Sequence, residues 1–116
     1  MVGLNSQQFG PHKEEWQPGE SAHFEYHCNE SHDSPDAPAW YRSHHPVVVL
    51  KANKEDEKAN GVEGLSMAER ADAGAPRTYK VQFPDGLKWD AWEDELLTHP
   101  KYYERPDPPS PPERRV

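Results

Sequence analysis

The sequence predicts a mainly β protein that folds as a single small barrel, and three observations carry this prediction. The segment from Thr78 to Leu97 has the pattern of a β-hairpin, and two earlier segments have strand-like patterns. The chain also contains thirteen prolines and seven glycines, a composition that disfavours a helical bundle. With 116 residues, of which 33% are hydrophobic, it has room for one domain with a modest core.

The hairpin is the most specific pattern. Apolar residues alternate up to Phe83, the turn Pro84-Asp85-Gly86 follows, and alternation resumes at Leu87. Proline presets φ in such a turn, and glycine takes the left-handed conformation that closes a three-residue loop. One register satisfies core and surface together: it pairs Phe83 with Leu87, Val81 with Trp89, Tyr79 with Ala91, and Lys80 with Asp90.

After the hairpin, we expect the strand to run to about Trp92 and a single helical or 3-10 turn to follow at Glu93–Leu97. A helix that begins at Asp90, with Glu93 completing a capping box, is the alternative. Upstream, Pro46–Lys51 is β-branched and apolar on both faces, which is typical of a central strand. Ala39–Arg42 is interpreted as a short strand or a loop that covers the core.

The segment Ser21–Cys28 alternates and is predicted to form a strand. Its two faces carry different chemistry: Ala22, Phe24, Tyr26 and Cys28 lie on one, and His23, Glu25 and His27 on the other. The second set has side chains that bind zinc, so a zinc site at His23, Glu25 and His27 is one hypothesis. A solvated polar face, with Cys28 as a small core residue, is the other.

The remaining segments complete the domain layout. Residues 1–15 are predicted to be a flexible arm, 16–103 the barrel, and 52–77 a long polar insertion within it. In that insertion, a capping box at Ser66-Met67-Ala68-Glu69 and a glycine at position 74 predict a short helix over Met67–Ala73. Residues 104–116 form a proline-rich tail, expected to be disordered, in which 109–114 fits the P-x-x-P-x-R pattern of SH3 ligands.

The net charge of −8 disfavours nucleic acid as a partner, because an acidic surface repels phosphate and the only clustered basic pair is Arg114-Arg115. No apolar segment is long enough to span a membrane, and no signal-peptide pattern is present. A single cysteine excludes internal disulfides, so a cytoplasmic location is the expectation. Cys28 beside His27 or His32 suggests a nucleophilic pair, but it lacks a family signature and an orienting group.

Two exposed positions among the aromatic residues suggest a binding surface. Trp92 falls on the non-core face of the hairpin, and Trp40, beside Tyr41, falls in a loop. With Glu93 and Asp94 alongside, these residues are the candidate partner-binding site. An aromatic cage for a methylated ammonium group is a narrower version of this hypothesis. The other aromatics are expected in the core: Phe24, Tyr26, Tyr79, Phe83 and Trp89.

The order of these motifs resembles SH3-like small barrels. Tyr79, Val81 and Phe83, followed by a turn and an acidic segment ending in leucine, are similar to the hairpin of Tudor-type domains. The same residues followed by Trp89, Trp92, Glu93 and Leu96 are similar to the barrel domain of the nitrile hydratase β-subunit family. That second resemblance implies an accessory subunit, because the metal-binding cysteine cluster of nitrile hydratase belongs to the α subunit.

We therefore expect a non-enzymatic interaction module that binds a protein or peptide through exposed aromatics, with acidic residues that select a basic partner. The alternative is an accessory subunit or small enzyme whose site forms between barrels of a homo-oligomer, because a barrel of this size has little interior volume. No cofactor other than zinc is suggested by the sequence, and no membrane partner is expected.

Overall fold

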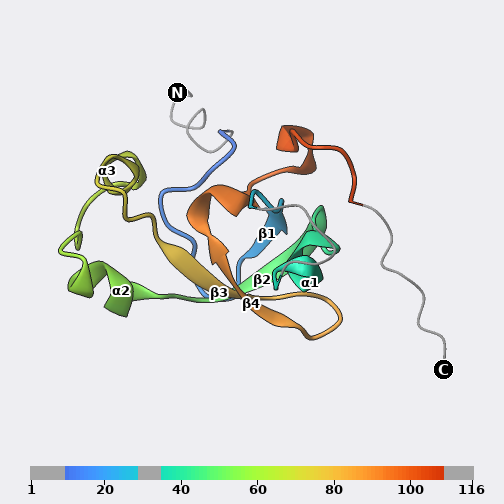
Figure 1. Cartoon of the computed structure of the whole chain (residues 1–116), viewed down its shortest axis with the longest axis horizontal. Coiled ribbons are helices and arrows are strands. Elements are labelled where there is room, and N and C mark those ends of the chain that lie inside the picture. The colour runs from blue at the N-terminus through green and yellow to red at the C-terminus, as the bar shows by residue number, and fades with distance from the viewer. Residues whose placement is uncertain (1–9, 29–34, 109–116) are drawn as a thin grey trace, which may run out of the picture.

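The computed structural model describes residues 10–28 and 35–108, and it shows a mainly β fold. Five strands form one antiparallel sheet in the order β4-β3-β2-β1-β5 (Figure 1). The strands are β1 (Ser21–Phe24), β2 (His45–Ala52), β3 (Thr78–Gln82), β4 (Lys88–Trp92) and β5 (Leu96–Leu97). The helices are α1 (Ala37–Trp40), α2 (Lys54–Ala59) and α3 (Met67–Asp72), with 3-10 turns η2 (Glu93–Glu95) and η3 (Pro100–Tyr102). Within the described residues, no helix is long and apolar enough to cross a membrane.

The sheet is not a closed barrel, which corrects the predicted architecture. In the described part of the chain, β4 pairs with β3 alone and β5 pairs with β1 alone. The single turn η2 carries the chain from β4 at one edge to β5 at the other. Because β5 is only two residues long, it offers too little backbone to close the sheet onto β4.

The hairpin has the predicted register. Tyr79 pairs with Ala91, Lys80 with Asp90, and Val81 with Trp89, and the Phe83 N–H donates to the Leu87 carbonyl at 2.8 Å. The Lys80 Nζ lies 3.0 Å from the Asp90 carboxylate, so the cross-strand charge pair forms as well. The strand ends at Trp92 and is followed by η2, so the alternative helix beginning at Asp90 is wrong.

β2 is a central strand, as its composition predicted, because it pairs with β1 on one side and β3 on the other. Only one of its faces is covered: Val47 and Val49 are buried, whereas Val48 is exposed. The inner face of the sheet holds the core, which consists of Trp16, Ala22, Phe24, Tyr26, Ala39, Val47, Val49, Tyr79, Val81, Phe83, Ala91 and Leu96.

Two upstream predictions are corrected. β1 ends at Phe24 rather than Cys28, because the Glu25 N–H then donates to the Glu95 carbonyl and the chain leaves the β2 ladder. Ala39–Arg42 is neither a strand nor a loop: Ala39 and Trp40 end the single-turn helix α1, which has proline in its first turn, where a missing N–H is tolerated.

The insertion between β2 and β3 contains two short helices, which lie together at one side of the sheet, away from α1 (Figure 1). α3 begins at the expected capping box, in which the Ser66 Oγ accepts from the Glu69 N–H and the Glu69 carboxylate accepts from the Ser66 N–H. α3 is followed by Gly74 with φ of 72°. α2 was not anticipated, because its sequence K-E-D-E-K-A has almost no apolar residues to mark a buried face.

A buried ion pair ties α3 to the sheet. The Arg70 guanidinium contacts the Glu93 carboxylate at 2.7 and 3.1 Å, and both side chains are almost fully buried. The Glu93 carboxylate also accepts the Arg77 backbone N–H at 2.6 Å. Glu93 thereby joins the insertion, the start of β3 and the end of β4.

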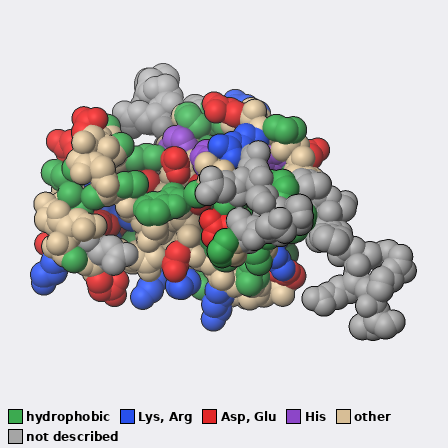
Figure 2. All heavy atoms as spheres, in the orientation of Figure 1, with side chains coloured by type: hydrophobic (Ala, Val, Ile, Leu, Met, Phe, Trp, Pro, Cys, Tyr) green, Lys and Arg blue, Asp and Glu red, His purple; other side chains and the backbone are tan. Residues whose placement is uncertain are grey.

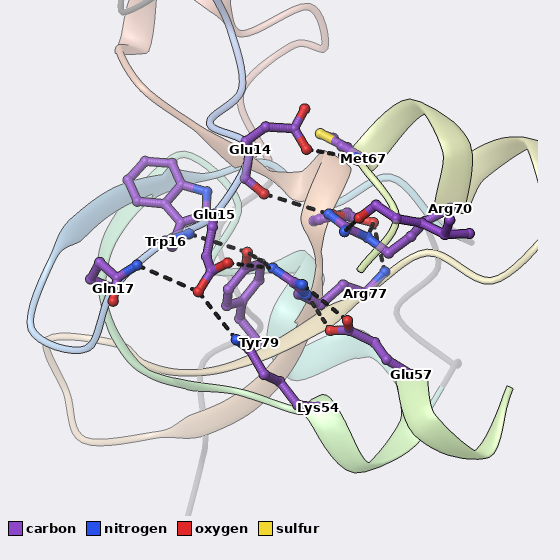
Figure 3. A network of polar contacts seen from close by, with 12 residues as sticks. Glu14, Glu15, Trp16, Gln17, Lys54, Glu57, Met67, Arg70, Arg77 and Tyr79 are labelled. Carbon is purple, nitrogen blue, oxygen red and sulfur yellow. Dashed lines mark hydrogen bonds and ion pairs between the residues drawn. The ribbon is translucent and has the colours of Figure 1, made fainter. Parts of the chain in front are cut away.

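A second buried pair lies beside the first (Figure 3). Arg77 and Glu57 form a two-contact ion pair, which brings α2 against the start of β3. Arg77 also donates to the Tyr79 hydroxyl at 3.0 Å, and that hydroxyl accepts the Trp16 backbone N–H at 3.1 Å. The insertion is therefore joined to the core through polar groups rather than through an apolar face.

The described part of the predicted N-terminal arm, residues 10–15, makes specific contacts. The Thr98 N–H donates to the Pro11 carbonyl at 3.0 Å, and the Thr98 hydroxyl donates to the Gly10 carbonyl at 2.7 Å. The Glu14 carboxylate accepts the Met67 N–H at 2.7 Å at the start of α3. Gly10 and Pro11 thus lie beside the end of β5, whereas Glu14 lies against the start of α3.

Replacing Gly86 by alanine is expected to destabilise the hairpin. Gly86 has φ of 97° with open space around it, so a methyl group would meet no atom and the effect is confined to backbone strain. We expect a loss of about 1–2 kcal/mol in the free energy of unfolding, measured by urea denaturation. Gly10→Ala is the matched control, because Gly10 also has open space but lacks a positive φ. Equal effects of the two changes would contradict the register.

Glu93→Gln is expected to lower the free energy of unfolding by about 3–5 kcal/mol, because it leaves the buried Arg70 guanidinium without its counter-charge. Glu63→Gln, on the exposed loop before α3, is expected to change it by less than about 0.5 kcal/mol. Urea denaturation of both variants at neutral pH measures the difference. Similar stabilities would mean that the insertion is not held by this ion pair.

Candidate interaction surface

Two large hydrophobic side chains, Val48 and Trp92, are strongly exposed among the described residues, and both lie on the outer face of the sheet. Their exposed fractions are 42% and 41%. Side chains alternate along a strand, so Val48 points away from the core because Val47 and Val49 point into it. Trp92 alternates in the same way with the buried Ala91. The sequence prediction that Trp92 lies on the non-core face is thereby confirmed.

A hollow of about 450 Å³ lies beside Val48. A bulge in β2 contributes to it: the register shifts between Val49 and Lys51, so Leu50 is an extra residue that stays partly exposed. The hollow is mainly apolar, and its lining consists of Ser21, Pro46, Val47, Val48, Leu50, Gln82, Phe83 and Pro84.

The same face carries three lysines. Lys51 and Lys80 are opposite each other in the β2–β3 register, and Lys88 is opposite Gln82 in the β3–β4 register. Asp90 lies beside them, and its carboxylate is shared by Lys80 at 3.0 Å and by the Asn53 side chain at 3.1 Å. Figure 2 shows Lys and Arg side chains projecting along the lower edge of the molecule, with some Asp and Glu side chains between them. The outer face is therefore apolar and basic in a chain whose net charge is −8.

The structure does not bring the predicted aromatic residues to one surface. Trp40 packs against the core and stacks on Tyr41, with ring centroids 5.2 Å apart. Tyr41 lines a different hollow, together with Pro84 at the hairpin turn. Trp92 pairs with Thr78 at the opposite end of the hairpin. An extended strand from the turn to Trp92 spans roughly 17 Å, which separates the two aromatic positions.

The acidic residues Glu93, Asp94 and Glu95, two of which were predicted to join the binding surface, are not all available to a partner. Glu93 is buried against Arg70, and Glu95 is buried with its carboxylate accepting the N–H groups of His27 and Trp92. Burial raises the pKa of Glu95 above its ordinary value. Asp94 alone keeps an exposed carboxylate, 3.7 Å from the His27 ring. A basic partner would therefore find one available carboxylate here rather than three.

Glu25, predicted to lie on a solvated face, is instead a buried hydrogen-bonding centre. Its carboxylate lies 2.7 Å from the His44 Nε2 and 3.2 Å from the His27 Nε2. It also accepts the backbone N–H groups of Glu104 and Arg105. Burial alone would raise the pKa of Glu25, but these hydrogen bonds outweigh it and lower the pKa to about 2.

The centre at Glu25 holds the start of the predicted tail in place. The Tyr103 ring stacks on His44 with centroids 3.9 Å apart, and Asp107 lies 2.9 Å from the His44 Nδ1. The Arg105 guanidinium donates to the carbonyls of Tyr26 and His27. Residues 103–107, named here the C-terminal strap, are thus docked, whereas the predicted SH3-ligand motif at 109–114 lies outside the described residues.

The predicted metal and nucleophile positions have other contacts. His23 packs edge-on against Tyr103, while Glu25 and His27 contact each other. Across residues 10–28 and 35–108, no group of three or more His, Cys, Asp or Glu side chains is arranged to hold a metal ion. The zinc hypothesis stays a prediction. Cys28 is largely exposed rather than in the core. Partial desolvation of its thiol, together with the nearby Glu95 carboxylate, raises the thiol pKa to about 11, so the thiol is protonated at neutral pH. His32 lies outside the described residues.

The sequence contained an indication of the basic face that the alternation of apolar and polar residues did not reveal. Lysine is depleted in strands, yet β2, β3 and β4 each contain one. The hairpin register pairs Lys80 with Asp90, but the opposition of Lys51 and Lys80 depends on pairing across the whole insertion and on the bulge at Leu50.

Comparison with known proteins finds no matching family model, no matching curated protein and no matching solved structure. The resemblance to Tudor-type domains and to the nitrile hydratase β-subunit family therefore stays a prediction from the sequence.

Glu25→Gln is expected to release the C-terminal strap and to lower the free energy of unfolding at pH 7 by about 2–4 kcal/mol. The folded-state pKa of Glu25 is depressed from 4.5 to about 2, so its stabilising effect is present above pH 4.5 and is lost as the pH falls toward 2. The difference between wild type and variant should shrink over that pH range in urea denaturation.

Glu104→Gln is the control for this experiment, because Glu104 contacts Glu25 through its backbone N–H, which the change preserves. A stability difference between wild type and Glu25→Gln that stays constant from pH 7 to pH 2 would contradict the assignment. So would a Glu104→Gln variant as unstable as Glu25→Gln.

Proposed function

We propose that this chain is a non-enzymatic interaction module that binds a protein or peptide on the outer face of its sheet. The observation that carries this proposal is the exposure of Val48 and Trp92 on one face of the sheet, with an apolar hollow beside Val48. Exposed apolar side chains are characteristic of binding sites, and tryptophan contributes strongly to binding energy. Trp92 is retained from the sequence hypothesis, whereas Tyr41 lies at a separate hollow and Trp40 packs against the core.

The fold is proposed to be an open relative of the SH3-like barrel. What supports this is the arrangement in which β1 to β4 neighbour one another in sequence order, while β5 returns beside β1 through a single 3-10 turn. A sheet of this kind has one covered face and one face available to a partner.

Two features support binding rather than catalysis. The Cys28 thiol, with its pKa raised to about 11, is a poor nucleophile at neutral pH. The Glu25 carboxylate is buried and accepts hydrogen bonds from two histidines and two backbone N–H groups, so its role is to hold the C-terminal strap.

The proposal is tested by selecting peptides that bind the wild-type protein from a random displayed library. The selected peptides are expected to bind the Val48→Ser and Trp92→Ala variants roughly tenfold or more weakly, because each change removes an exposed apolar contact. Tyr41→Ala is the matched aromatic control on the other surface and should bind as wild type does. Binding is measured by fluorescence anisotropy and folding by thermal melting.

Two outcomes would overturn the proposal. The first is peptides that bind Val48→Ser and Trp92→Ala with wild-type affinity. The second is binding that depends on Tyr41 instead, which would place the surface beside α1. Backbone NMR shift changes on adding a selected peptide give an independent map, with Lys51, Gln82, Lys88 and Trp92 expected to move most.

A further inference from the structure

We infer that the partner is an acidic, extended segment of another protein, whose carboxylates meet the lysines of the outer face while its apolar side chains meet Val48 and Trp92. This inference rests on the proposed function and names the chemistry of the partner. It reverses the sequence expectation, in which the acidic run was to select a basic partner.

Uncompensated positive charge is the first support. Lys51 and Lys80 face each other across β2 and β3, and like charges in that position repel. Lys80 has Asp90 as a partner, but within the described part of the chain Lys51 and Lys88 have no ion pair. Because Lys51, Lys80 and Lys88 outnumber Asp90 here, an anionic partner would relieve a repulsion that the free protein retains.

The spacing of the apolar and basic groups is the second support. Residues that are partners across neighbouring strands form rows on the outer face. Val48, Gln82 and Lys88 form one row, and Trp92 and Thr78 form another. Lys51 and Lys80 lie in a row between these two. Successive rows on one face of a sheet are roughly 6.6 Å apart, and neighbouring strands roughly 4.8 Å apart. Val48 and Trp92 are thus separated by roughly 16 Å, the length of about five extended residues. An extended segment with acidic residues between two apolar ones matches this arrangement.

The free edge of β4 is the third support. β5 lies at the other edge of the sheet, where residues 10–12 cover it through contacts with Leu96 and Thr98. No described segment pairs with the outer side of β4. At this edge the Trp92 N–H is already bonded to the Glu95 carboxylate, so the backbone groups that remain available to an extended chain lie toward Lys88.

The test uses a labelled peptide in which four acidic residues separate a leucine from a phenylalanine, and fluorescence anisotropy as the measurement. We expect saturable binding that weakens with added salt. We also expect Lys51→Glu and Lys88→Glu to weaken binding roughly tenfold each. Lys101→Glu, on η3, changes the net charge equally away from the face and should stay within about twofold of wild type. Thermal melts establish that each variant is folded.

The control peptide, with glutamine and asparagine in place of the acidic residues, separates this inference from the proposed function. Equal binding of the two peptides, with Val48→Ser and Trp92→Ala still weakening both, would overturn the acidic partner and leave the interaction module standing. Binding unaffected by Val48→Ser and Trp92→Ala would overturn both. No binding of the acidic peptide at millimolar concentration also overturns the inference.

Two other occupants are distinguished in the same experiment. A single-stranded oligonucleotide that displaces the acidic peptide, and binds more tightly, would assign the face to nucleic acid. A wild-type dimer in sedimentation that Lys51→Glu dissociates would assign it to a second copy of the chain. Either result overturns the inference, whereas a monomer that prefers the acidic peptide supports it.

Discussion

The buried carboxylate of Glu93 is the contact on which much of the architecture depends. It receives the Arg70 guanidinium from α3 and the Arg77 backbone N–H from the start of β3, while its own backbone ends β4. Removing one partner of such a pair is far more damaging than the pair's net contribution suggests, because it leaves a buried charge unpaired. This site fixes where the insertion docks and therefore where the outer face ends.

Two groups of buried polar contacts hold segments against the sheet, as additional buried apolar area does in larger domains. Glu93 and Arg77 hold the insertion at one side of the sheet, and Glu25 holds the C-terminal strap at the other. A chain with 33% hydrophobic residues has little more to bury than one face of a sheet. Its outer face therefore stays uncovered, which is the physical basis of the proposed binding surface.

The distribution of charge matters more here than its sum. The acidic residues near Trp92 suggested a basic partner, yet several carboxylates of this chain bond to internal groups, namely Arg70, Arg77 and the groups around Glu25. The lysines of β2, β3 and β4 remain at the surface of the sheet. The electrostatic potential that an approaching partner meets depends on which charged side chains are left unpaired at the surface. The amino-acid composition does not specify this.

The sequence by itself determined the local elements: the hairpin register with its Gly86 turn, the central position of β2, the α3 capping box and the outward direction of Trp92. These follow from alternation and turn chemistry within a few residues. Tertiary structure decided the rest, namely the open sheet, the burial of Glu25 and Glu93, and the facing of Lys51 and Lys80. Each of these depends on contacts between segments far apart in the chain, whose pairing no local pattern encodes.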